Sequence, residues 1–231
     1  MRNALLAPSI ALICSLVLSA SGKGQYLDPR KAEDYFEKKN YIKALDIYKK
    51  LIEQDPSKPE YFRKAGICYL RLYRDRKSAA KYLKKALKKE GHDKVVWYYL
   101  GKAYMMQNEF QKANKNFTKY KMKKGLMGGK DDVAHLQSQC KTGKELKKHP
   151  LDVSFKNLGT GINTEHPDYY PFVAKDESML AFTSRRRDNQ GGGREMDGWF
   201  PSDIWIAEPK KEGKGFAEAE SAGRRVNSKY D

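Results

Sequence analysis

The chain has 231 residues, which is enough for one or two domains, and it carries a formal net charge of +17. The charge is uneven: residues 30–150 hold 32 Lys/Arg against 14 Asp/Glu (+18), whereas residues 151–231 hold 12 against 14 (−2). Such a field favours an acidic partner for the first part, although lysine pairs such as Lys84 and Lys85 also suit solvated helix faces. Beyond residue 22 no apolar run approaches the length of a membrane span, which excludes a protein with several spans.

Residues 1–22 predict a secretory signal peptide. A short basic start, Met1–Asn3, precedes the mostly apolar stretch Ala4–Ala20, and small residues suited to a signal peptidase follow at Ala20–Gly22. The alternative is a membrane anchor, but the stretch is at the lower length limit for a span and contains Pro8. We therefore expect an exported protein. Export argues against nucleic acid as a partner and leaves an acidic cell-wall polymer or an anionic lipid surface as candidates.

Residues 25–126 carry three copies of a helical repeat with tetratricopeptide (TPR) spacing. The TPR signature is W-x2-L-G-x2-Y followed by A-x3-F, with a period of about 34 residues. Small residues that let two helices approach recur at Ala32, Gly66 and Gly101, which lie 34 and 35 positions apart (66 − 32 and 101 − 66). The third copy matches the signature at the following residues: Trp97, Leu100, Gly101, Tyr104, Ala113 and Phe117. This pattern predicts an α-α TPR solenoid.

Residues 131–149 predict a helix that caps the solenoid. Asp131 and Asp132 suit the positive end of a helix dipole. The expected apolar side consists of Val133, Leu136, Cys140 and Leu146. A repeat array needs such a terminal helix to cover the open end of its core. Because stacked repeats touch only their neighbours, Cys68 in the middle repeat and Cys140 in the cap are expected to be buried and unbridged.

Residues 151–231 change to short β-type runs separated by turn residues. We expect strands at Val153–Phe155, Pro171–Ala174, Met179–Thr183 and Ile204–Ala207. Between the last two, Arg185–Ser202 is expected to form a long glycine-containing loop.

These runs resemble a known type of domain. Tyr170-Pro171-Phe172, Asp176-Glu177-Ser178, the stretch Ala181–Arg185 and Asp203-Ile204-Trp205 resemble one blade of a TolB-like, WD-type β-propeller. The order of signal peptide, TPR repeats and blade is similar to a group of Bacteroidetes envelope proteins, which includes the PorE-like proteins of type IX secretion. The resemblance implies an α + β multidomain protein in which 151–231 is the first blade and the start of a second. It also implies that further blades and an OmpA-like, peptidoglycan-binding domain follow in the whole protein, and that the protein lies in the periplasm, associated with the outer membrane.

The sequence offers no catalytic, cofactor or metal site that we would expect to function. Residues 125–131 are one residue short of a phosphate-binding loop and have Asp131 where Ser or Thr is needed. Asp188, Asp197 and Asp203 lack the spacing of a calcium loop. Four histidines lack paired zinc-ligand spacing: His92, His135, His149 and His166.

The remaining candidate site is the TPR groove, which the resemblance implies receives an extended peptide or a partner helix. Its expected lining residues are Glu60, Arg63, Ile67, Val95, Tyr98, Lys102 and Met105. Arg63 and Lys102 are expected to hold a carboxylate, and Tyr98 and Met105 to supply apolar contact. The alternative is a groove that serves only to pack against the downstream propeller.

The sequence therefore predicts a non-catalytic scaffold that binds envelope proteins through its groove, in an outer-membrane-associated or type IX secretion assembly. Peptidoglycan is expected as a partner only through a further C-terminal domain. One alternative is the exported binding segment of a peptidase or other hydrolase, because TolB-like propellers also precede peptidase domains. Another is a basic module that binds anionic lipid or glycan directly.

Overall fold

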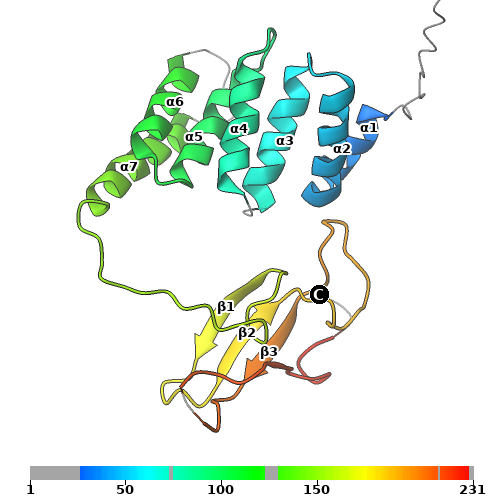
Figure 1. Cartoon of the computed structure of the whole chain (residues 1–231), viewed down its shortest axis with the longest axis vertical. Coiled ribbons are helices and arrows are strands. Elements are labelled where there is room, and N and C mark those ends of the chain that lie inside the picture. Colours follow the sequence, from blue (N-terminus) through cyan, green and yellow to red (C-terminus); the bar gives the residue numbers. More distant parts are fainter. Residues whose placement is uncertain (1–26, 73–74, 123–129, 213, 229–231) are drawn as a thin grey trace, which may run out of the picture.

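The computed structural model describes residues 27–72, 75–122, 130–212 and 214–228, and within them seven helices precede a four-stranded sheet (Figure 1). The helices are α1 (Pro29–Glu37), α2 (Tyr41–Gln54), α3 (Pro59–Leu72), α4 (Arg76–Leu87), α5 (Val95–Met105), α6 (Phe110–Met122) and α7 (Lys130–Leu146). The predicted signal peptide lies outside the described residues, as does most of the stretch 125–131. Among the described helices, none is long and apolar enough to cross a membrane.

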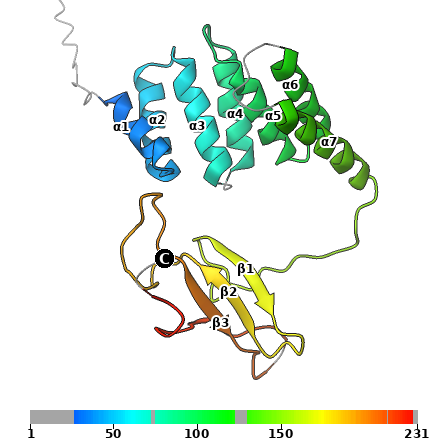
Figure 2. The ribbon, with the colours of Figure 1, turned by 180° about the vertical axis from the view of Figure 1, so that it is seen from behind.

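The helices form three antiparallel hairpins that stand side by side in chain order, with α7 at the end (Figures 1 and 2). Short polar residues begin several of them. Asn40 Oδ1 accepts a hydrogen bond from the Lys43 backbone amide at the start of α2. Asp75 Oδ1 accepts from the amides of Lys77 and Ser78 at the start of α4. These side chains satisfy amides that have no partner within the helix. The predicted α-α solenoid is present.

Glycine sets the distance between the two helices of the second and third hairpins. A Cβ atom on Gly66 would lie 2.6 Å from Leu83 Cγ, and one on Gly101 would lie 2.5 Å from Phe117 Cε1. Carbon atoms in contact normally stay about 3.5–4.0 Å apart. The repeat spacing read from the sequence thus reflects a steric requirement at the crossing of each helix pair.

The core of the solenoid is a series of buried clusters between successive helices. Cys68 is fully buried with Ala65 in the cluster of the first hairpins, and Cys140 is buried in the cluster beside α7. Both thiols are free. Burial raises the pKa of the Cys68 thiol to about 12, so it behaves as a small apolar group.

Helix α7 covers the end of the array. Val133, Leu136 and Cys140 are buried against α6, and a Cβ on Gly143 would lie 2.5 Å from Phe110 Cζ. Leu146, expected on the same apolar side, is instead 66% exposed. Phe110, which packs on Gly143, is the first residue of α6, so Leu146 at the end of α7 lies beyond the helix that buries the earlier apolar positions.

The sheet is an antiparallel meander in the order β1-β2-β3-β4, from β1 (Asp168–Val173), β2 (Leu180–Ser184), β3 (Asp203–Ala207) and β4 (Glu220–Ser221). Its core gathers Ile162, Leu180, Phe182, Trp205, Ala207 and Ala219 on one face. The expected strand at Val153–Phe155 was wrong, because this segment pairs with no other strand and leaves Val153 60% and Phe155 96% exposed. The two-residue strand β4 was not expected. That the sheet is a propeller blade stays a prediction.

A buried arginine organises the sheet core. The Arg186 guanidinium lies 4.1 Å above the Trp205 ring, and its Nη2 is 3.5 Å from Asp168 Oδ1. Its Nε donates to Ser184 Oγ at 2.9 Å, and Nη2 donates to the Ile162 carbonyl at 3.1 Å. A buried charge needs such partners, because removing it from water is costly when it is unpaired.

The expected loop Arg185–Ser202 is present and reaches the first repeat. Arg185 forms ion pairs with Glu195 and Asp197, which fold the loop back on itself. Its buried Gly198, at φ +91°, lies so close to Asn40 that a Cβ there would be 2.6 Å from Asn40 Oδ1. The loop thus connects the sheet to the N-terminus of α2 (Figure 1).

Candidate functional site: the groove of α3, α5 and α7

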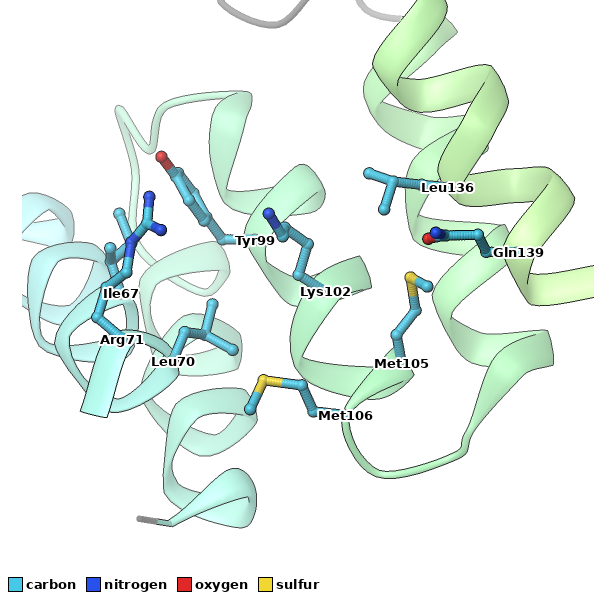
Figure 3. Close-up of a pocket in the computed structure, with 9 residues that line it drawn as sticks. All are labelled: Ile67, Leu70, Arg71, Tyr99, Lys102, Met105, Met106, Leu136 and Gln139. Carbon is cyan, nitrogen blue, oxygen red and sulfur yellow. The ribbon is translucent and has the colours of Figure 1, made fainter. Parts of the chain in front are cut away.

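Two adjoining hollows form one groove along the first helices of the hairpins. The first hollow, of about 240 Å³, is lined by α3, α5 and α7 (Figure 3). The second, of about 350 Å³, adds residues from α1 and from the start of α5. The hollows share four lining residues: Ile67, Arg71, Tyr99 and Lys102.

Six of the seven residues expected in the groove line these hollows. Arg63, Val95 and Tyr98 line the second hollow and Met105 the first, while Ile67 and Lys102 line both. Glu60 lines neither of these two hollows, and its place in the groove stays a prediction. It lies exposed in the first turn of α3, one turn before Arg63.

Sequence reasoning missed other lining residues, mainly Leu70, Arg71, Tyr99, Met106 and Leu136. Most follow a helical signal that was available. Leu70 and Arg71 lie three and four positions after Ile67, and Tyr99 lies four after Val95, so they continue the same face of their helices. Leu136 comes from α7, whose contribution to the groove depends on how the cap packs.

Tyr98 ties the floor of the groove to the cap. Its hydroxyl donates to Asp132 Oδ2 at 2.5 Å, and its ring lies 5.3 Å from Tyr99 and 5.5 Å from Tyr120. Burial, together with this hydrogen bond, raises the pKa of Tyr98 above its ordinary value. The hydroxyl therefore stays protonated at neutral pH and holds Asp132 in place.

The groove has an excess of free cations. Among the described residues, Arg63 and Arg71 form no hydrogen bond or ion pair, and Lys102 has only the Tyr98 ring 5.3 Å from its Nζ. Two carboxylates, Asp93 and Asp132, also line the second hollow; each accepts a hydrogen bond from a neutral donor, the Val95 amide and the Tyr98 hydroxyl, and keeps its negative charge.

One further cation in the groove is already neutralised. Lys64 pairs with Glu33 and lies 3.9 Å above the Phe36 ring, so it is held within the array. Arg63, Arg71 and Lys102 therefore remain as positive charge that an anionic ligand can reach.

No cluster of three or more His, Cys, Asp or Glu side chains that could hold a metal ion occurs among the described residues. Of the aspartates that flank the glycine loop, Asp197 is ion-paired with Arg185. Asp203 accepts a hydrogen bond from the Gln190 amide through Oδ2.

No family model and no curated protein matches the sequence. Among solved structures, the chain is similar to the first TPR domain of human RPAP3, with 17% identity and a TM-score of 0.47 over 53% of this chain and 94% of that one. It is also similar to the Sgt2 TPR domain from Aspergillus fumigatus, with 19% identity and a TM-score of 0.46 over 57% of this chain and 85% of that one. The description of a TPR-type array rests on the repeat spacing and helix pairing of this chain itself.

Proposed function

We propose that this chain is a non-catalytic scaffold that binds a protein partner in the groove of α3, α5 and α7. The observation that carries this proposal is the set of unpaired cations, Arg63, Arg71 and Lys102, which line a continuous hollow beside apolar side chains. Apolar surface with a few placed polar groups is the usual composition of a binding site.

We further propose that the scaffold acts in the cell envelope, as part of an outer-membrane-associated or type IX secretion assembly. The signal-like residues 1–22 and the envelope-protein resemblance of the sequence support this location. N-terminal sequencing of the protein isolated from a periplasmic fraction tests it. A mature terminus shortly after residue 20 is expected, whereas an intact Met1 in the cytosolic fraction would overturn the location but not the binding role.

Site-specific photocrosslinking in living cells tests the binding role. A photoreactive phenylalanine analogue in place of Tyr99 lies in both hollows, whereas the same analogue at the exposed Lys84 of α4 or Lys115 of α6 lies outside them. We expect a discrete crosslinked product from position 99 that weakens when Arg71→Glu is added. Equal or stronger crosslinking from positions 84 and 115 would place the partner elsewhere and contradict the proposal.

A further inference from the structure

The two ends of the groove differ in chemistry, and the repeat aligns them across helices. Arg63 and Tyr98, Ile67 and Lys102, and Leu70 and Met105 are each 35 positions apart (98 − 63, 102 − 67 and 105 − 70). They therefore form three successive rows from the N-terminal to the C-terminal half of α3 and α5. The first row is cationic and aromatic, and the third is apolar.

Figure 3 shows the same division inside the first hollow. The guanidinium of Arg71, the hydroxyl of Tyr99 and the ammonium of Lys102 extend toward one side, while Leu70 and Met106 lie on the other. Leu136 of α7 adds an apolar group on the far side of the hollow from Arg71, and in this view the polar Gln139 lies between it and Met105. Methionine side chains are flexible and polarisable, so this end can adapt to large apolar groups of different shape.

The distance between the two ends follows from helix geometry. Arg63 and Leu70 are seven residues apart in α3, as are Tyr98 and Met105 in α5. At a rise of about 1.5 Å per residue, the first and third rows lie about 10.5 Å apart. An extended peptide covers about 3.3 Å per residue, so it spans this distance in about three residues.

We propose that the occupant of the groove is an acidic peptide segment of a partner protein, with a large apolar side chain within about three residues of its carboxylates. This inference rests on the proposed function and narrows it. The carboxylates lie against Arg63 of the first row, Lys102 of the second and Arg71, which follows Leu70 in α3. The apolar side chain packs on Leu70 and Met105 of the third row. Charge complementarity favours this occupant, because three cations without an ion pair line the groove against two carboxylates, Asp93 and Asp132.

In the first arm of the test, a library of displayed random peptides is selected for binding to the immobilised full chain. Enrichment of Asp or Glu together with Leu, Met or Phe within three positions is the expected result. Enriched peptides without that pairing would overturn this inference and leave the proposed function standing. If no peptide is enriched, both fail.

The second arm measures the affinity of one selected peptide by fluorescence anisotropy. Arg71→Ala and Met105→Gln are each expected to weaken binding about tenfold, since a charge-assisted hydrogen bond or a buried apolar anchor typically contributes that much. The matched control is Lys115→Ala, which removes an exposed cation from α6 outside the groove and is expected to leave the affinity unchanged. Equal effects of Lys115→Ala and Arg71→Ala would show a general charge effect and contradict the assigned site.

A charge-reversed variant is predicted to change its specificity, which a variant that had merely lost its fold would not do. A chain with Arg71→Glu and Lys102→Glu, both at solvent-accessible positions, is expected to fold and to select basic rather than acidic peptides. Unchanged selection of acidic peptides by this folded variant would overturn the inference. Raising the salt concentration is expected to weaken the wild-type complex, because charges at the surface are screened over about 10 Å at 0.1 M salt.

Discussion

The substitution Gly101→Ala tests the steric basis of the repeat. The new Cβ would lie 2.5, 2.7 and 2.8 Å from three carbons of the Phe117 ring, about 1 Å inside normal contact distance. Phe117 is fully buried, with Tyr98 6.1 Å away between ring centroids, so the ring cannot move without displacing its neighbours. Overpacking of this kind costs about 1–3 kcal/mol. Alanine in place of glycine within a helix returns about 1 kcal/mol, which leaves a net loss of about 1 kcal/mol of unfolding free energy.

The same substitution in a Phe117→Leu background separates the two effects. Removal of the ring removes the clash, so Gly101→Ala is then expected to stabilise the array by about 1 kcal/mol through helix propensity alone. The coupling free energy between the two positions is therefore about 2 kcal/mol. Urea unfolding followed by far-UV circular dichroism measures it, because all the described helices belong to the array. An equal effect of Gly101→Ala in both backgrounds would refute the contact.

Three further outcomes follow from other contacts of the fold. Burial alone would raise the pKa of Glu33, but hydrogen bonds from Lys64 and a buried tyrosine outweigh it, and the pKa lies below 4.5. The stability that Glu33 contributes is therefore present above pH 4.5 and lost as the pH falls below it. The loss of unfolding free energy caused by Glu33→Gln, measured by urea unfolding, should shrink between about pH 5 and pH 3. A loss that stays constant with pH would contradict this. Gly198→Ala should separate the sheet from α2 and increase the radius of gyration in X-ray scattering, whereas Gly192→Ala, also at positive φ but with nothing within 4 Å, should not; equal effects would mean that the Asn40 contact does not hold the two parts together. Arg186→Met should destabilise the sheet by about 3–5 kcal/mol, because it leaves the buried Asp168 carboxylate without its cationic partner. The change in tryptophan fluorescence that reports exposure of Trp205 should then occur at a lower urea concentration. An unchanged midpoint would refute the network.

The helical part was predictable because its constraints are local and periodic. Close approach at Gly66 and Gly101 repeats every 34–35 residues, and the same offset aligns the groove residues across helices. Glu60 lies at a helix end, one turn before Arg63, where a side chain on the same helix face falls outside the two hollows. The prediction for Leu146 was wrong, since an apolar position is buried only where a neighbouring helix reaches it.

The sheet part was harder to predict because its contacts depend on pairing between distant segments. Val153 and Phe155 alternate with polar residues as a strand would, yet alternation does not supply a partner strand. Strand β4 has only two residues, both polar, and so no periodic signal. The contact of Gly198 with Asn40 joins residues 158 positions apart (198 − 40), and no local pattern marks it.

Chemical-shift mapping on the isotope-labelled full chain tests the central claim most directly. A peptide selected from the library is added, and the backbone amides that shift are assigned. The account predicts that the largest shifts fall on α3, α5 and α7, around Ile67, Lys102 and Leu136, which line the hollows. Shifts concentrated on α2, α4 and α6, or on the sheet, would show that the partner binds elsewhere and would contradict the groove as the functional site.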